Sequence, residues 1–313
     1  MDLKTDILND DAPGISAAAD ILRAGGLVAF PTETVYGLGA DARNDMAVAR
    51  IFDAKGRPRF NPLIVHVASI KAAQGLVEWS DMADRLAGAF WPGPLTLVLP
   101  LKPNSGLSPL VTAELPTLAI RLPAHPVGQA LLTAFDGPIA APSANPSGRI
   151  SPTTADHVEA GLSGKVDAIV AGGACDVGLE STIIGLHPAP RLLRPGGLPT
   201  TAIEAALGAP LEAHGPDESI TAPGQMTSHY APDAPMRLNA RAANPGEVLL
   251  GFGDVAGDLT LSASGDLVEA AANLFGHLHR LNDMAKPIAV APIPKKGLGI
   301  AINDRLKRAA APR

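Results

Sequence analysis

Residues 27–39 read LVAFPTETVYGLG. The first four are apolar and follow a glycine pair at 25–26 that ends a helix-like segment, so they predict a short buried strand. A stretch carrying hydroxyl and carboxyl groups begins directly after them. Because open α/β sheets place ligands beyond the ends of their strands, this stretch is the first candidate for a functional site.

Helix-like and strand-like segments alternate through the first two thirds of the chain. Several connections are too short for helical crossovers, which favours a mixed sheet with helices packed against it. Helices are expected at 17–23, 45–54, 82–91 and 200–207, with Asn44 or Asp45 and Thr200 or Thr201 as N-caps and Gly56 near a C-cap. Strands are expected at 27–30, 62–67, 95–99, 118–122, 139–141, 168–170, 182–186 and 191–194.

The periodic pattern disappears from about 211 to 235 and then resumes. A strand at 247–250, a helix at 266–281, a strand at 287–291 and a helix at 300–309 predict a small parallel, Rossmann-like domain. We therefore expect three parts: a domain at 12–208, a linker at 209–235 and a C-terminal domain at 236–313.

Composition limits the class of protein. Hydrophobic residues make up 46% of the 313 residues and charged residues 18%, which favours a folded, core-forming chain. The net charge of −6 argues against a basic nucleic-acid binder, although a local basic patch remains compatible. The single Cys175, expected to be buried, excludes an internal disulfide and a cysteine-rich metal site. With no secretory signal and no apolar run of about 20 residues, the expected location is cytoplasmic, without a membrane contact.

Nucleotide-binding motifs are absent or weak. There is no P-loop, and the relaxed pattern G-x-G-x-x-A at 37–42 and 251–256 is better explained by glycine turns after strands. Two histidines at 277 and 279 face different sides of a predicted helix and have no nearby cysteine, so a metal site there is not expected.

Two loops are candidates for phosphate or nucleotide binding. Residues 55–59 read KGRPR, which is either a favourable placement of cations after a helix or a rigid loop that aims them at phosphates. Residues 143–148 read SANPSG, which is either an ordinary turn or a set of hydroxyl, amide and N–H groups for a nucleotide.

Two charged or titratable residues lie inside apolar strands. His66 alone is read more readily as a core residue than as a ligand. Arg121 is more informative, because a buried unpaired charge is costly. It requires a carboxylate partner, supplied either by the protein or by a ligand.

Eight segments, taken in order, carry a resemblance. They read PTETVYGLG at 31–39, KGRP at 55–58, NPLIVHV at 61–67, WPGPLT at 91–96, APSAN at 141–145, GLESTI at 178–183, RLLRPG at 191–196 and SHYAP at 228–232. With the ending GLGIAINDRL at 297–306, the set resembles the long, two-domain form of the threonylcarbamoyl-AMP synthase family. The resemblance implies a YrdC-like twisted mixed sheet with flanking helices, followed by a smaller Rossmann-like α/β domain.

The same resemblance implies an activity. The family, as a nucleotidyltransferase, joins L-threonine, bicarbonate and ATP, with Mg²⁺, into threonylcarbamoyl-AMP and pyrophosphate. A separate transferase complex then uses the product to form N6-threonylcarbamoyladenosine at position 37 of tRNA. The resemblance also allows weak tRNA binding. No protein metal site is implied, because the nucleotide mainly holds the Mg²⁺.

The family's site residues carry over to matching positions of this chain. The positions matching the L-threonine site are Thr34, His66, Arg121 and Ser181. Those matching the ATP and phosphate site are Lys55, Arg57, Asn61, Thr117, Ser143, Asn145, Ser151, Arg194 and Tyr230, with Lys55 and Arg57 expected to stabilise charge during catalysis and Tyr230 to close over the cavity. Some family members carry a hydroxyl where Ala141 stands, so one threonine contact is expected to be absent or supplied by backbone.

Two other functions compete with this reading. A carbamoyl-transfer role, as in hydrogenase maturation proteins, is disfavoured because those proteins carry zinc-binding cysteines and this chain has only Cys175. A non-catalytic RNA-binding or ribosome-assembly role is disfavoured by the acidic total charge and the absence of Lys/Arg runs.

Overall fold

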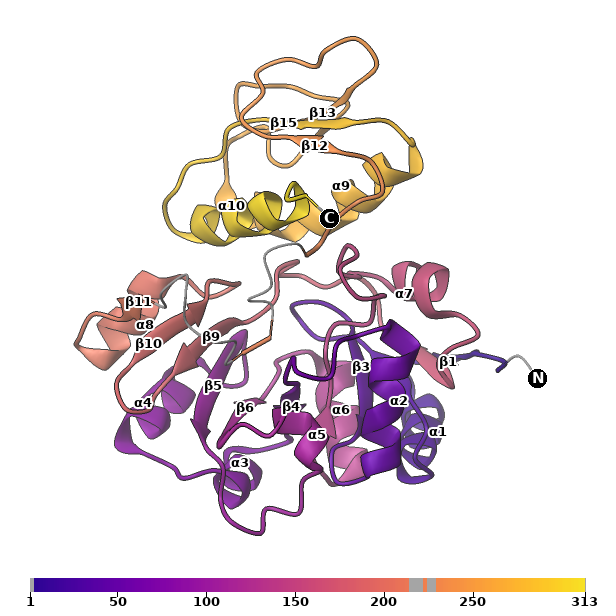
Figure 1. Ribbon diagram of the computed structural model, residues 1–313, viewed down its shortest axis with the longest axis vertical. Coiled ribbons are helices and arrows are strands. Elements are labelled where there is room, and N and C mark those ends of the chain that lie inside the picture. The colour runs from indigo at the N-terminus through magenta and orange to yellow at the C-terminus, as the bar shows by residue number, and fades with distance from the viewer. Residues whose placement is uncertain (1–2, 214–221, 224–228, 313) are drawn as a thin grey trace.

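The fold has two parts, each built on its own sheet (Figure 1). The computed structural model describes residues 3–213, 222–223 and 229–312. Among these residues, eleven strands form the larger sheet in the order β1-β8-β2-β3-β7-β4-β6-β5-β9-β10-β11. Their bounds are β1 Asp6–Asn9, β2 Val28–Phe30, β3 Gly37–Asp41, β4 Ile64–His66, β5 Leu95–Pro100, β6 Thr117–Arg121, β7 Ile139–Ala140, β8 Ala168–Ala171, β9 Thr182–Gly185, β10 Arg191–Arg194 and β11 Glu212–Ala213.

Helices cover both faces of this sheet because its strands are apolar on both sides. Val28 and Phe30 face the core formed by α1 and α6, whereas Leu27 and Ala29 belong to the opposite core, which α2, α4, α7 and α8 close. This alternation is the two-residue period of a strand. The helices are α1 Ala12–Arg23, α2 Asp45–Lys55, α3 Ile70–Leu76, α4 Asp81–Phe90, α5 Pro109–Thr112, α6 Pro126–Phe135, α7 Ala155–Leu162 and α8 Thr200–Leu207.

The smaller part is a parallel sheet with two helices on the side that faces the larger part (Figure 1). Its strands, in the order β12-β15-β13-β14, are β12 Met236–Arg237, β13 Val248–Gly251, β14 Leu259–Thr260 and β15 Ile288–Val290, and its helices are α9 Leu267–Asp283 and α10 Leu298–Ala309. Its apolar core also includes Val35, Ile150 and Leu179 of the larger part. The two parts therefore share one packed boundary.

The predicted fold class is confirmed, and two local expectations are wrong. Gly37 and Gly39 belong to strand β3 instead of a turn; a Cβ at Gly39 would come within 2.9 Å of Phe30 and Ile139, so close strand packing explains this glycine. The N-cap of α8 is Pro199, which makes no side-chain cap hydrogen bond, so neither Thr200 nor Thr201 caps that helix.

Two further sequence expectations concern the linker and the membrane. Of the expected linker at 209–235, residues 214–221 and 224–228, including Ser228, lie outside the described residues. Within the part of the chain that the structure describes, no helix is long and apolar enough to cross a membrane.

Candidate active site

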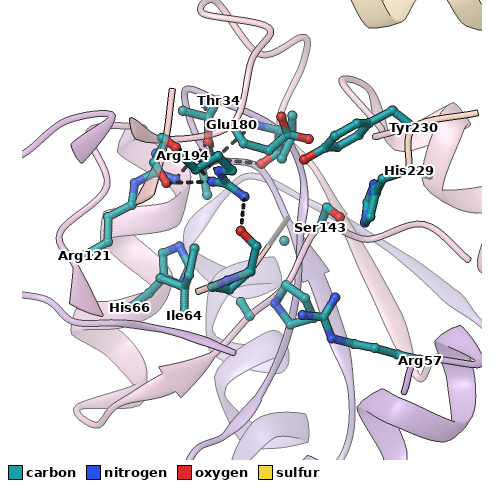
Figure 2. A pocket seen from close by; sticks show the side chains of 17 residues that line it. Thr34, Arg57, Ile64, His66, Arg121, Ser143, Glu180, Arg194, His229 and Tyr230 are labelled. Carbon is teal, nitrogen blue, oxygen red and sulfur yellow. Dashed lines mark hydrogen bonds between the residues drawn. The ribbon is translucent and has the colours of Figure 1, made fainter. Parts of the chain in front are cut away.

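A pocket opens where several strands of the larger sheet end and the linker passes over them (Figure 2). Its free volume is about 50 Å³. The lining residues are Thr32, Thr34, Val35, Gly37, Arg57, Ile64, His66, Arg121, Ala141, Pro142, Ser143, Glu180, Ser181, Arg194, Pro223, His229 and Tyr230. The structure thus brings together members of both groups of predicted site residues.

One side of the pocket is centred on Arg121, the last residue of β6. Arg121 lies directly beside His66 in the parallel pairing of β6 with β4. Its Nη1 donates a hydrogen bond to Thr34 Oγ1 at 2.9 Å, and its Nη2 lies 2.8 Å from the Glu33 carboxylate, with both side chains buried. The carboxylate partner that the sequence required is therefore supplied by the protein, from a residue that the sequence analysis did not select.

Thr34 and His66 complete this side. The Thr34 hydroxyl lies 2.8 Å from that of Thr32, and Arg121 further donates through Nε to the Gly93 carbonyl at 3.2 Å. Burial, reinforced by the Arg121 charge, lowers the pKa of His66 to about 3. His66 is therefore neutral at pH 7, and Arg121 is the cation of this side.

The other side carries two more guanidinium groups. Helix α2 ends at Gly56, whose φ of +60° turns the chain away from the helix axis and sends Arg57 back towards the strands. Arg57 Nη2 donates to the Pro62 carbonyl at 2.9 Å, and burial lowers its pKa to about 10. Arg194, at the end of β10, donates to the carbonyls of Ser181 at 2.8 Å and Pro223 at 3.2 Å. Both groups remain charged and line the pocket, as phosphate binding requires.

Lys55 lies behind the pocket wall and is not among the lining residues. Its Nζ donates to the backbone carbonyls of Ser143, at 2.6 Å, and Asn145. Its pKa lies well below the usual value, because of burial first and the Arg57 charge second. In this arrangement Lys55 braces the 143–145 loop, and only Ser143 of that loop faces the pocket.

Four other predicted residues also lie outside the lining. Asn61 is buried beside Arg57, whose Nε lies 3.4 Å from the Asn61 carbonyl oxygen. Asn145 Nδ2 donates to the Pro146 and Arg149 carbonyls, and Ser151 Oγ donates to the Glu180 carboxylate at 2.5 Å. Thr117 begins β6, about 13 Å along the strand from Arg121. The first three support the wall, while Thr117 lies at the far end of its strand.

Ser181 and Glu180 form the wall between the two sides. The Ser181 hydroxyl lies 2.7 Å from that of Thr96, and its backbone carbonyl accepts from Arg194. Glu180, which the sequence analysis quoted but did not select, presents a buried carboxylate to the pocket. Glu33 and Glu180 both lie in segments that the sequence analysis quoted. The sequence signal that could have selected them is a carboxylate among apolar or small neighbours.

The linker forms the remaining wall. Tyr230 points into the pocket in Figure 2, and its ring centroid lies 4.1 Å from that of His229, which the sequence analysis did not select as a site residue. Burial lowers the pKa of His229 to about 3, so this ring is neutral at pH 7. His229 and Tyr230 both line the pocket, together with Pro223 of the linker.

Two sequence families match the chain. The family described as "Telomere recombination" (Sua5, YciO and YrdC) matches residues 20–196, and that described as "Threonylcarbamoyl-AMP synthase, C-terminal domain" matches residues 199–311. A threonylcarbamoyl-AMP synthase of Bacillus subtilis (strain 168) is 42% identical over 335 residues, which cover 99% of this chain and 96% of the relative. This chain belongs to the threonylcarbamoyl-AMP synthase family.

A second relative and two solved structures agree with that assignment. A threonylcarbamoyl-AMP synthase of Pyrococcus abyssi is 41% identical over 95% of this chain and 94% of its own length. The crystal structure of P. abyssi Sua5 complexed with L-threonine matches with a TM-score of 0.90 at 39% identity, covering 98% of each chain. The Escherichia coli YciO structure matches 62% of this chain with a TM-score of 0.56 at 24% identity, which shows the shared fold of the larger part alone.

Proposed function

We propose that this protein is an L-threonylcarbamoyladenylate synthase, a nucleotidyltransferase that forms threonylcarbamoyl-AMP and pyrophosphate from L-threonine, bicarbonate and ATP. One observation carries the proposal beyond family membership. A single pocket holds Arg121 with Thr34 and His66 on one side and the Arg57 and Arg194 guanidiniums on the other. An amino-acid carboxylate and a polyphosphate are the two anionic groups that the reaction must bring together.

L-threonine is proposed to bind at Arg121. Its carboxylate would meet the guanidinium, with the Thr34 and Ser181 hydroxyls and the neutral His66 imidazole close by. A neutral His66 can accept or donate a hydrogen bond without repelling the substrate ammonium group. Support for threonine comes from the P. abyssi structure, whose bound amino acid is L-threonine.

The chemistry needs alignment and charge stabilisation more than a nucleophilic side chain. The threonine amine attacks bicarbonate and water leaves, which gives a carbamate; a carbamate oxygen then attacks the α-phosphorus of ATP, and pyrophosphate leaves with the bonding electrons. Arg57 and Arg194 line the pocket where negative charge would accumulate, and Lys55 holds the loop that carries Ser143. These roles follow from position and charge.

Mg²⁺ is proposed to enter with ATP. The described residues contain no cluster of three or more His, Cys, Asp and Glu side chains suited to a metal ion. Mg²⁺ commonly binds through substrate phosphates with few protein ligands, and there it would neutralise the leaving pyrophosphate. We further propose that the protein works in the cytoplasm and passes its product to a separate tRNA-modifying transferase complex.

The test is pyrophosphate release by purified protein supplied with ATP, Mg²⁺, bicarbonate and L-threonine. The proposal predicts release that requires both threonine and bicarbonate, together with an AMP-linked product of the mass of threonylcarbamoyl-AMP. L-serine and L-valine, which each lack one feature of the threonine side chain, serve as matched controls. Release without threonine, or no release from folded protein, would contradict the proposal.

A further inference from the structure

Arg305 is a fully buried cation in the smaller part of the molecule. It lies on α10, has 0% exposure, and reaches across the boundary between the two parts. Its Nε donates to Glu180 Oε2 at 2.7 Å and its Nη1 to Asp304 Oδ2 at 2.7 Å. Because burying a guanidinium is costly without charged partners, these contacts fix its position, and they tie α10 to a residue of the pocket wall.

Arg305 also touches Tyr230. Its guanidinium carbon lies 5.1 Å from the centre of the Tyr230 ring, in cation–π geometry, and Phe275 of α9 lies 5.7 Å from the same ring. Tyr230 has a φ of +63°, which a bulky residue adopts only when its surroundings hold it there. The smaller part therefore holds the aromatic residue that covers the pocket in this conformation.

Glu180 is a carboxylate in a pocket whose other charged lining residues are Arg57, Arg121 and Arg194. Burial by itself would raise its pKa, yet the pKa lies below the usual value because of the charges of Arg305 and Arg194 and the hydrogen bond from Ser151. Of these two cations, Arg194 lines the pocket and Arg305 does not. If Arg305 were absent, the Glu180 carboxylate would place a negative charge in the pocket without its ion-pair partner, and this charge would repel a phosphate.

From these contacts we infer that Arg305 is a positioning residue through which the C-terminal part sets up the nucleotide side of the pocket. Arg305 balances the charge of Glu180, a carboxylate that lines the pocket, and it packs against the ring of Tyr230. Among the described residues its contacts are with Glu180, Asp304 and Tyr230, none of which belongs to the Arg121 side, so Arg305 is expected to act on ATP binding and not on threonine binding. This role adds a residue to the proposed function, and the identity of the nucleotide as ATP rests on that proposed function.

The test compares ATP and threonine binding by calorimetry in full-length Arg305→Met and in wild type. ATP is titrated with Mg²⁺ in degassed, bicarbonate-free buffer, so that no turnover occurs, and L-threonine is titrated separately. Since Arg305→Met can destabilise the fold, the double variant Arg305→Met/Glu180→Gln removes both buried charges together, a change that proteins often tolerate. Lys307→Met is the matched control, because it removes an exposed cation from the same helix.

We expect Arg305→Met to weaken ATP binding at least about tenfold and to leave the threonine Kd within about twofold. The double variant should recover part of that loss, because no unpaired Glu180 carboxylate remains to repel phosphate, while Lys307→Met should match wild type. Folded variants that bind ATP within twofold of wild type, or that lose ATP and threonine affinity in parallel, would overturn the inference. If wild type binds ATP but forms no product, the proposed function fails while this comparison of affinities still decides the role of Arg305.

Discussion

The two sides of the pocket are built in different ways. The Arg121 side consists of residues at or beside strand ends of one sheet, held by neighbours such as Glu33 and Thr34. The Arg57 and Arg194 side combines a loop after α2, the end of β10, the linker residue Tyr230 and, through Glu180, the distant helix α10. The contacts described for Arg121 lie within the larger part, whereas those of Tyr230 and Glu180 involve both parts of the chain. If the two sides bind threonine and ATP as proposed, a substitution on one side should separate amino-acid binding from nucleotide binding.

The largest effect is expected at Arg121. Arg121→Met removes the only guanidinium in the threonine-side lining of the described pocket and leaves Glu33 as an unpaired buried carboxylate. Truncating one partner of a buried, hydrogen-bonded charge pair in a binding site costs about 2–5 kcal/mol of binding free energy, so threonine-dependent pyrophosphate release at low threonine concentration should fall by roughly 10²–10³-fold. Initial rates measured against threonine concentration check this.

A double variant separates binding from folding at this site. Arg121→Met/Glu33→Gln removes both charges, so its thermal stability should recover while threonine affinity does not. Recovery of threonine affinity in the double variant would show that Arg121 serves only to neutralise Glu33, and the distinction between the two sides would be lost.

A smaller effect is expected at Lys55. Lys55→Met removes the donor to the Ser143 and Asn145 carbonyls, and unpaired buried carbonyls cost about 1–3 kcal/mol each. The loop should shift, and kcat/KM for ATP should fall by about 10–50-fold. Steady-state kinetics measure it, with Lys71→Met on the exposed face of α3 as control. An unchanged kcat/KM for ATP would show that the 143–145 loop does not contribute to the nucleotide side.

The contact between the two parts should weaken in acid. His279 of α9 stacks on His157 of α7 with ring centroids 3.8 Å apart, and burial followed by the His157 charge lowers the pKa of His279 to about 4. A histidine whose folded pKa lies below its unfolded value stabilises the fold above about pH 6.5, and that contribution is lost as the pH falls towards 4. His279 alone should account for a loss of about 2 kcal/mol between pH 7 and pH 5.

Urea unfolding at several pH values measures this loss. His279→Phe should flatten the dependence between pH 6.5 and 4, because the ring is kept and its titration is removed. Replacement of the exposed His187 by Gln should leave the dependence unchanged. If His279→Phe keeps the wild-type slope, the boundary between the two parts is not the acid-sensitive element.

The smallest effect is expected at Ala141. This residue lines the pocket and is 3% exposed, and its Cβ lies 3.3 Å from the position a Cβ on Gly37 would take. Ala141→Ser would restore the hydroxyl found in some family members. Because one hydrogen bond contributes about 1 kcal/mol, we expect the KM for threonine to change by no more than about fivefold and that for ATP not at all. A larger effect on ATP would place Ala141 on the nucleotide side.

The sequence predicts best those elements that have clear periodicity and end signals. Helix α2 is an example: Asn44 caps its start, accepting from the N–H groups of Met46 and Ala47, and Gly56 ends it. Helix α6 is not among the helices expected from the sequence, although Pro126 at its first position is compatible with a helix start. Gly128 is demanded by packing, since a Cβ there would lie 2.8 Å from the Pro31 carbonyl oxygen. Such contacts between distant segments carry no local signal.

The site shows the same limit. Arg121 could be selected because a charge in an apolar strand requires a partner, but the choice of Glu33 over a ligand depends on how the loop after β2 folds back on β6. Glu180 and Arg305 are 125 positions apart, and nothing in either segment indicates the other. Lys55 was expected to face phosphate, whereas its direction depends on the path of the 143–145 loop. Roles in binding and catalysis for all these residues remain predictions.

The pairing of Glu180 with Arg305 has a consequence during synthesis of the chain. A ribosome makes Glu180 first, and 125 further positions must be added before its partner exists. Until then the Glu180 carboxylate lacks the Arg305 partner. If Arg305 has the positioning role proposed above, a nascent or prematurely terminated chain that ends before Arg305 should bind ATP more weakly than the full-length chain.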